Sequence, residues 1–413
     1  MDNFVEKIVK GKMKMHELDN MVSVKEAVEI RRRAVEKLTG TSLKNTGSGI
    51  VDAETACRKN IENMIGATQV PLGIAGPLKV NGEGAKGEYY VPLATTEGAL
   101  VASVNRGCSA ATKSGGVLVY AENKGMTRAP VFRTSGLRES KEFVSWVKKN
   151  FLRIKKVAES TTKYGRLTEI QPWIVGRNVF LRFVFDTKDA MGMNMAVIAC
   201  DAVIRELVDK ETKVKCISLS GNVCTDKKPS AINFISGRGK SVHAEAIIKK
   251  EIIEKVLKTS AKHIFEVNYR KNLLGSAVAS SLGFNAHYGN IAAAVFLACG
   301  QDIAHVTEAA MGVTTCEMLG DDLYISVYIP NLNIGTVGGG TGLGTQKEAL
   351  EILGVLGASG KAGENAHKLA EIVGAAVLCG ELSLLSAFTS RDVAKAHTRL
   401  GRGNENVLLQ KII

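Results

Sequence analysis

The chain contains 413 residues, of which 45% are hydrophobic and 23% are charged, and 54 basic against 41 acidic residues give a net charge of +13. This length fits two or three domains of roughly 100–200 residues each, and the composition excludes a mainly disordered, collagen-like or coiled-coil chain. The 42 glycines against only 7 prolines indicate close packing and close backbone approach rather than flexible linkers.

Residues 1–60 are expected to form a small N-terminal helical region. Within it, Ser23 and Glu26 have the spacing of a capping box and precede a helix. Residues 61–128 are expected to form the first part of a large domain. Its stretch GALVASVNRGCSAATKSGG is dominated by small residues, so we expect a helix that approaches its neighbours closely.

Residues 129–218 differ in composition from the rest of the chain. They hold only 4 glycines but both tryptophans and 6 of the 12 phenylalanines, and their 17 basic and 10 acidic residues carry +7 of the net charge. A strand-like run at 179–185 lies between helical patterns at 141–157 and 195–208. We therefore expect an inserted α+β domain with its own hydrophobic core.

Residues 219–413 return to the glycine-rich composition and should contain a connecting loop, the second part of the large domain and a C-terminal segment. The patterns predict helices over 242–269, 290–311, 346–356 and 363–390, and a strand over 325–329. The predicted fold class is therefore α+β, with a discontinuous large domain around a central helix that is interrupted by the basic insert.

The cysteines and the apolar runs bear on metal binding and location. The eight cysteines are scattered singly, and no Cys/His cluster has metal-ligand spacing, so no metal site is expected. The N-terminus lacks an apolar core of signal-peptide length, and no uninterrupted apolar run approaches 18 residues. We expect a reduced, cytoplasmic protein that binds no membrane.

Three ionisable positions could build a buried site. Asp302 lies in an apolar helical pattern, where a carboxylate needs a partner or a task. Glu97 lies near the start of the small-residue helix, where it could serve chemistry or only the helix dipole. Lys227 and Lys228 lie in CTDKKP, next to Asp226, where a lysine pair is either a solvated surface feature or part of a site.

The glycine-rich segments do not match known nucleotide-binding fingerprints. GTVGGGTGLG (335–344) fits no register of GxGxxG, and SGRGKS (236–241) lacks the first glycine of a P-loop. The first segment could be a tight turn or a backbone cradle for a phosphate or amide. DAMGMN (189–194) leads directly into a helix and could bind an anion, although its methionines could equally be core residues.

Six long motifs together resemble the 3-hydroxy-3-methylglutaryl-CoA (HMG-CoA) reductase family. They are ENMIGATQVPLGIAGP (62–77), TTEGALVASVNRGC (95–108), DAMGMN (189–194), SGNVCTDKKPSAINFISGRGKS (220–241), ACGQD (298–302) and GTVGGGT (335–341). The resemblance extends from about Glu62 to Arg402. It is closest to the first-class, archaeal-type form without a membrane anchor, and it implies a ferredoxin-like insert that binds the cofactor.

The resemblance implies the four-electron reduction of HMG-CoA by two NADPH to mevalonate and CoA. Lys227 would stabilise the developing oxyanion, Glu97 would donate a proton, and Asp302 would hold the lysine and tune both groups. His397 would protonate the departing CoA thiolate, a role that suits an imidazole near neutral pH. Taken alone, a single late histidine is more often a surface residue.

The resemblance also implies binding residues. Arg128, Ser220, Asp226, Lys228, Lys271 and Asn290 would hold the HMG portion, Arg106 would contact CoA, and His287 would position the site. NADPH would be bound by Asp189, Met191, Gly192, Met193, Asn194, Lys163, Gly338, Gly339, Gly340 and Arg402, with Asp189 and Asn194 most exposed to it. The active unit would be a homodimer, and many members of the family are tetramers.

Three positions depart from the animal members of the family. Ser109 replaces an arginine near Arg106 that would contact a CoA phosphate, and Lys163 replaces an arginine beside the cofactor's 2′-phosphate. Lysine offers a point charge rather than a planar fork, so NADPH preference would rest on a different contact. Gly403 occupies the position of a regulatory serine, so phosphorylation there is not implied.

Two other functions were weighed. A charge of +13 could indicate a nucleic-acid-binding protein, but the basic residues alternate with acids and no nucleic-acid motif is present. An NADH-dependent enzyme that oxidises mevalonate is disfavoured by DAMGMN and by the lysine of DKKP. Phosphorylated substrates explain the positive charge equally well.

Overall fold

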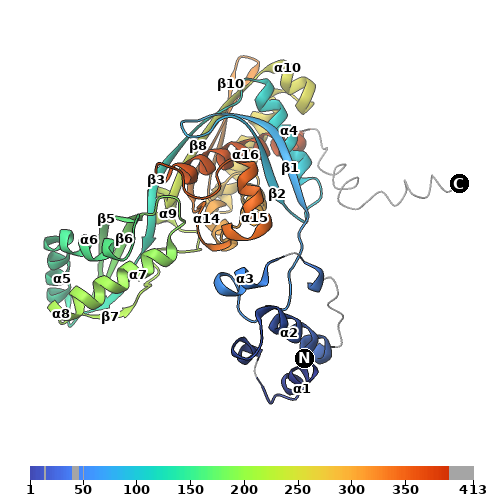
Figure 1. Cartoon of the computed structure of the whole chain (residues 1–413). Coiled ribbons are helices and arrows are strands. Elements are labelled where there is room, and N and C mark those ends of the chain that lie inside the picture. The colour runs from blue at the N-terminus through green and yellow to red at the C-terminus, as the bar shows by residue number, and fades with distance from the viewer. Residues whose placement is uncertain (14, 40–45, 50, 390–413) are drawn as a thin grey trace.

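The structure is a computed structural model that describes residues 1–13, 15–39, 46–49 and 51–389. It is a mixed α/β fold with an N-terminal helical group, a large mixed sheet around a long helix, and a smaller sheet with its own helices (Figure 1).

The N-terminal group contains α1 (Asp2–Val9), α2 (Val24–Thr39), α3 (Ala53–Lys59) and two short 3₁₀ helices, Met15–Asn20 and Thr46–Ser48. The predicted capping box is confirmed, because the Glu26 amide donates to Ser23 Oγ at 3.4 Å and the Ser23 amide donates to Glu26 Oε2 at 3.1 Å. A small core that includes Val5, Leu18 and Ile30 holds this group together.

The large sheet has the strand order β2-β1-β3-β8-β11-β10-β9. Its strands are β1 (Leu72–Asn81), β2 (Lys86–Ala94), β3 (Val117–Arg128), β8 (Gly239–Ile248), β9 (Gly283–Phe284), β10 (Gly312–Leu319) and β11 (Asp322–Leu332). All neighbours are antiparallel except the β1/β3 and β9/β10 pairs, so the sheet is mixed.

The helices of this part are α4 (Leu100–Lys113), α9 (Ala231–Ser236), α10 (Lys250–Ile252), α11 (Ala261–Val267), α12 (Ser276–Val278), α13 (Tyr288–Ala298), α14 (Val306–Ala309), α15 (Gly344–Ile352) and α16 (Glu364–Thr389). Two π-helical segments, Ile253–Leu257 and Asn268–Gly275, and two 3₁₀ turns, Ile303–His305 and Gly339–Gly342, complete it.

Helix α16 runs through the core between the large sheet and α4 (Figure 1). A Cβ on Gly107 of α4 would lie 1.9 Å from the Cys379 carbonyl oxygen of α16, and one on Gly374 would lie 2.4 Å from Val242 of β8. The predicted close approach of the small-residue helix is therefore confirmed. By length and composition α16 could cross a membrane, but 78% of its apolar window is buried inside the protein.

The smaller sheet has the antiparallel order β7-β4-β6-β5. Its elements are β4 (Val131–Arg133), α5 (Leu137–Lys149), α6 (Phe151–Ser160), β5 (Arg166–Val175), β6 (Asn178–Asp186), α7 (Met193–Val203), a π-helical turn (Ile204–Val208), α8 (Asp209–Glu211) and β7 (Lys215–Ser218). The end of β3 pairs with β6 and joins the two sheets. A separate cluster that includes Phe132, Phe143 and Phe183 lies between this sheet and its helices.

The helices predicted over 242–269 and 290–311 were wrong in part, and the helical stretch predicted over 141–157 is confirmed but divided. Residues 242–269 begin with β8, where Val242, Ala244 and Ala246 alternate toward the core with a period of two. The predicted helix over 290–311 is divided after Ala298, because Gly300 has a φ of +65° and a Cβ there would lie 2.4 Å from the Gly340 carbonyl oxygen. Residues 141–157 form two helices, α5 and α6, that meet at Asn150.

Candidate active site

The loop 219–230 between β7 and α9 presents the lysine pair. Its residues Asn222, Thr225 and Lys227 all have positive φ, a conformation that non-glycine residues adopt only when surrounding contacts hold them. One such contact is direct, because the Lys227 amide donates to Glu308 Oε1 at 2.6 Å. Glu308 is fully buried in α14, so the backbone of the 219–230 loop is attached to the core.

Lys227 and Asp302 form an ion pair at the surface of the site. The Lys227 ammonium lies 2.8 Å from Asp302 Oδ2, and the two side chains are 41% and 32% exposed. Asp302 lies before the Ile303–His305 turn and accepts the Ala304 amide, so it is not in the middle of a helix as predicted. Burial raises the pKa of Asp302, but the hydrogen bond from Lys227 and the nearby His305 outweigh it and hold the pKa below its ordinary value.

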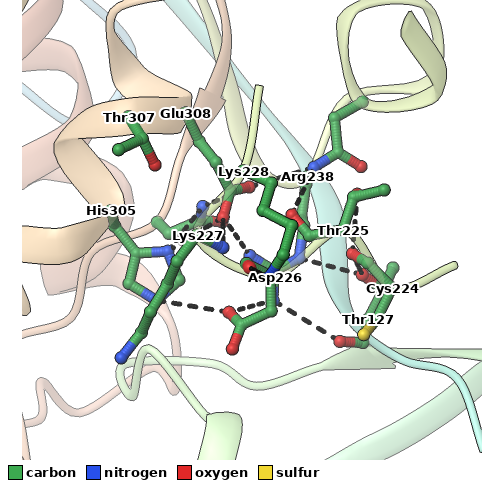
Figure 2. A network of polar contacts seen from close by, with 12 residues as sticks. Thr127, Cys224, Thr225, Asp226, Lys227, Lys228, Arg238, His305, Thr307 and Glu308 are labelled. Atoms are coloured by element: carbon green, nitrogen blue, oxygen red, sulfur yellow. Dashed lines mark hydrogen bonds and ion pairs between the residues drawn. The ribbon is translucent and has the colours of Figure 1, made fainter. Parts of the chain in front are cut away.

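A buried polar network lies beneath this pair (Figure 2). The fully buried Arg238 guanidinium donates to Glu308 Oε1 at 2.7 Å, to Asp226 Oδ1 at 3.0 Å and to Thr127 Oγ1 at 2.9 Å. Burial raises the pKa of Glu308, but the hydrogen bond with His305 and the charge of Arg238 outweigh it, so the net pKa is lowered. Glu308 is therefore a buried carboxylate held by positive and amide donors.

The ligand atoms of Asp226, His305 and Glu308 lie within 4.8 Å of one another, a spacing that could hold a metal ion. Arg238 donates to both carboxylates, so a positive charge is already present at this point. A divalent cation would be repelled by the guanidinium, and the arrangement favours an ion-pair network.

A second group surrounds Glu97. Asn290 of α13 donates to Glu97 Oε2 at 3.0 Å, and the Glu97 amide donates to Thr95 Oγ1. Glu97 precedes α4, which begins at Leu100, so its helix-dipole role is not supported. Among the described residues, no hydrogen bond or ion pair joins Glu97 to Lys227 or to Asp302.

The segment before α13 is held by Glu381 of α16. This buried carboxylate accepts the amides of Ala286 at 2.8 Å and His287 at 2.7 Å, and Thr314 Oγ1 at 2.7 Å. His287 is thereby positioned next to Asn290 by its backbone, while its buried Nε2 has no partner in the described structure. The central helix thus determines where Asn290 lies.

These motifs can now be compared with known proteins. A profile of the family described as hydroxymethylglutaryl-coenzyme A reductase matches residues 27–402. The chain belongs to this family. The 3-hydroxy-3-methylglutaryl-coenzyme A reductase of Pyrococcus abyssi is 53% identical over 407 residues, which are 97% of this chain and 100% of that protein. The enzyme of the same name from Methanocaldococcus jannaschii is 53% identical over 410 residues, with 97% and 100% covered.

A more distant relative and a solved structure agree with this assignment. A 3-hydroxy-3-methylglutaryl-coenzyme A reductase from Dictyostelium discoideum is 43% identical over 410 residues, which are 97% of this chain and 73% of that protein. The structure of the class II enzyme from Streptococcus pneumoniae bound to NADPH in open conformations covers 89% of this chain and 98% of its own, with a TM-score of 0.64 and 16% identity. At that identity, the similarity establishes the fold.

Of the residues expected to hold the HMG portion, Asn290 lies in the Glu97 group and most others lie near Lys227. Ser220 Oγ lies 3.4 Å from Cys224 Sγ, and the exposed Lys228 donates to the Asp226 carbonyl oxygen at 3.1 Å. Arg128 lies 3.9 Å from Asp226, so these residues lie around the Lys227 loop.

Lys271 and Arg106 lie elsewhere, against the end of α16. Lys271 is half-buried in the 268–275 segment, where its ammonium lies 3.1 Å from Asn272 Oδ1 and 5.5 Å from the centre of the Phe388 ring. Burial lowers the pKa of Lys271. Arg106 donates to Ser383 Oγ at 3.0 Å and to the Ser383 carbonyl oxygen at 2.7 Å, so its guanidinium is engaged with α16.

The segment DAMGMN differs in one respect from the expectation. Asp189 is not exposed, because its carboxylate is buried and accepts the amides of Gly363 at 2.7 Å and Ala366 at 3.1 Å at the start of α16. A carboxylate there satisfies free amides at the helix N-terminus, which explains its burial. Asn194, by contrast, is exposed in the first turn of α7, which begins after Gly192 at a φ of +93°.

The glycine segment lies beside DAMGMN. Ala190 pairs with Val337, and the Thr336 amide donates to the Asp189 carbonyl oxygen at 2.8 Å. Gly338 and Gly339 have φ values of +79° and +54°, and a Cβ at either would meet nothing within 4 Å. Gly340 instead packs on Gly300, so two of the three glycines face open space.

The remaining expected residues have varied environments. Met193 Sδ receives a hydrogen bond from Arg238 at 3.0 Å, and Met191 lies beside Gly335, whose Cβ would be 2.4 Å from the Met191 amide. Lys163 is exposed, with its ammonium 5.3 Å from the centre of the Tyr164 ring. His397 and Arg402 lie outside the described residues.

Sequence reasoning missed Arg238, His305 and Glu308. Arg238 lies within SGRGKS, which does not match a P-loop and ends the 220–241 motif, and the other two follow Asp302 at positions three and six. The sequence did contain a signal, because His305 and Glu308 are ionisable, three residues apart and close to the candidate carboxylate Asp302. Their burial could not be predicted, because it depends on contact with the 219–230 loop and with β11.

Proposed function

We propose that the protein reduces (S)-HMG-CoA to (R)-mevalonate and CoA, with oxidation of two NADPH and uptake of two protons, in the mevalonate pathway of isoprenoid synthesis. The observation that carries this proposal is the Lys227–Asp302 pair, 2.8 Å apart and half-exposed, within the motifs of this reductase family. An ammonium held at a site mouth is suited to stabilise the negative charge that develops on a thioester oxygen.

The first reduction depends on Lys227. Attack on the thioester carbonyl develops charge on its oxygen, and the Lys227 ammonium, oriented by Asp302, stabilises that oxyanion. Collapse of the hemithioacetal releases CoA as a thiolate, which His397 would protonate. Glu97, held by Asn290, would donate a proton to the aldehyde oxygen in the second reduction.

The residues present fit NADPH. Gly338 and Gly339 leave open space above their Cα atoms, and the N-terminus of α7 offers free amides near the exposed Asn194. NADPH supplies the hydride for each step when bound. Met191, Gly192, Met193 and Asn194 would bind it, Lys163 would pair with its 2′-phosphate and Arg402 with its other phosphates.

The finer assignments also belong to this proposal. The strand order β7-β4-β6-β5 with helical connections supports a ferredoxin-like cofactor domain at 129–218. About half of the residues are identical to archaeal relatives but only 16% to a class II structure, which supports a first-class, archaeal-type enzyme. We propose the domain boundaries 1–60, 61–128, 129–218 and 219–413, and a cytoplasmic location.

We propose a homodimer as the active unit, and this is supported by the described residues, among which no hydrogen bond or ion pair joins Glu97 or Asn290 to Lys227 or Asp302 within one chain. Mixing Glu97→Gln and Lys227→Ala proteins tests it. If the two groups meet across a dimer interface, re-formed mixed dimers recover about a quarter of wild-type activity, because half the dimers are mixed and each has one intact site. No recovery after subunit exchange would place both groups of a working site in one subunit.

The decisive assay is NADPH oxidation by the pure protein with HMG-CoA, with mevalonate and free thiol measured as products. Two NADPH consumed for each mevalonate formed is the expected result. No turnover, or a preference for NADH above about tenfold with mevalonate as the better substrate, would contradict the proposal and favour the oxidative alternative.

A further inference from the structure

His305 is a fully buried imidazole between the two aspartates of the site. Its Nε2 lies 3.7 Å from Asp226 Oδ1 and 3.8 Å from Asp302 Oδ2, and it has no hydrogen-bond partner in the described structure. Both oxygens already have a cation, since Arg238 lies against Asp226 and Lys227 against Asp302. Figure 2 shows the imidazole beside Lys227 and facing Asp226.

The contacts of the other ring nitrogen, Nδ1, determine which ring nitrogen of His305 carries a proton. His305 Nδ1 lies 3.2 Å from Glu308 Oε1 and 3.2 Å from Asn333 Nδ2. If Nδ1 accepts from the Asn333 amide, the neutral ring carries its proton on Nε2; if Nδ1 donates to Glu308 and the ring is charged, Nε2 is protonated as well. In the remaining form the ring is neutral and its proton is on Nδ1. This form is unfavourable, because the Nε2 lone pair would face two carboxylates.

We infer that His305 is a positioning residue that presents an Nε2–H to Asp226 and Asp302 and so couples the substrate-binding aspartate to the aspartate that orients Lys227. The charged groups around it are Asp226 from the 219–230 loop, Asp302 and Glu308 from its own segment, and Arg238 and Lys227 through the aspartates. A small shift of either carboxylate toward Nε2 would bring it within hydrogen-bond distance. This inference rests on the proposed function for its effect on turnover, but not for the position of the proton.

The position of the proton can be measured directly in the wild-type protein. Nitrogen-15 spectra of histidine-labelled protein, with the His305 signals assigned by their loss in His305→Gln, should show a protonated Nε2 across the pH range of activity. An unprotonated Nε2 would overturn the inference. This measurement is independent of turnover, so it stays decisive if HMG-CoA is not the substrate.

Two variants separate the donor from the bulk of the ring. The amide nitrogen of His305→Gln can reach the Nε2 position and donate to the aspartates, whereas the shorter amide of His305→Asn reaches only the Nδ1 position. We expect His305→Asn to lower kcat about ten- to a hundredfold with both HMG-CoA and mevaldehyde, with the KM for NADPH unchanged, and His305→Gln to retain most of kcat.

The dependence of kcat/KM on pH tests the inference, because loss of a merely structural residue would not shift it. His305 is one of the groups that lower the pKa of Asp302, so its loss should raise that pKa and move the acid limb of kcat/KM to higher pH in His305→Asn. Thr307→Val in the adjoining helix α14, where the Thr307 hydroxyl donates to the Ala304 carbonyl oxygen, should leave kcat and the profile unchanged. Equal impairment of the Gln and Asn variants, or an unmoved acid limb in a folded His305→Asn protein, would refute the inference.

Discussion

In the large part of the chain, α16 crosses α4 so closely that a single Cβ at Gly107 would overlap the backbone of Cys379. In residues 129–218, by contrast, the core is built from bulky rings such as Phe132 and Phe143, whose centres lie 5.0 Å apart. Residues outside 129–218 hold 38 of the 42 glycines, and residues 129–218 hold 4, together with +7 of the +13 net charge.

The two regions position their side chains in different ways. A helix that touches its neighbours through backbone atoms cannot shift without clashes, so the buried Glu371 and Glu381 of α16 can hold loops at fixed positions. The insert packs through large side chains, and its exposed basic residues include Lys163, whereas Arg182 is buried. This contrast agrees with the proposed roles, in which the first region would position residues that bind HMG and the second would attract a phosphorylated cofactor.

The largest expected effect is on kcat and comes from a change at Lys227, which the large part of the chain holds in place. Lys227→Ala should lower kcat about a thousandfold for both HMG-CoA and mevaldehyde, because the oxyanion of each step loses its ammonium. Steady-state kinetics with both substrates checks this, and the exposed surface substitution Lys262→Ala is the matched control. A loss confined to one of the two reductions would contradict a shared role for Lys227.

Removal of an aromatic ring from the core of the insert should destabilise the insert alone. Phe132→Ala removes a fully buried side chain and should destabilise the insert by about 3–5 kcal/mol. Hydrogen exchange should then show faster exchange in β4, β6 and α7, while α16 keeps its protection. The half-exposed Phe265→Ala is the control. Equal loss of protection in α16 would mean that the two cores unfold as one.

Glycine substitutions compare the two regions directly. Gly107→Ala should lower the free energy of unfolding by about 3 kcal/mol or more, because its methyl group has no space against α16. Gly176 in the insert has a φ of +60° and nothing within 4 Å of its Cβ position, so Gly176→Ala should cost only about 1 kcal/mol of backbone strain. Denaturant unfolding of both variants measures the difference; similar costs would remove the contrast.

The smallest effect concerns the charge of the insert. Lys163→Gln should raise the KM for NADPH about five- to tenfold and leave the KM for NADH and for HMG-CoA unchanged, since an exposed ammonium pairs weakly with a phosphate. Kinetics with both cofactors and added salt checks this. An equal rise in the KM for NADH would place Lys163 away from the 2′-phosphate.

Several features followed from local sequence alone. The capping box at Ser23 and Glu26, the strand at β6, the strand at β11 and the helix α16 were predicted because a few neighbouring residues or a simple period determine them. The composition change at residue 129 also corresponds to a separate hydrophobic cluster. The motifs indicated the family because long stretches of the chain carry them.

Only the tertiary structure decided the rest. Val242–Ile248 is a strand because β3 and β11 lie on both sides of it, although its composition also permits a helix. Asp189 accepts a backbone amide at the start of α16, and Glu308 accepts the backbone amide of Lys227. Both contacts form because segments far apart in the chain meet there. Whether a charged side chain is exposed or buried depends on such contacts, and a single sequence does not contain them.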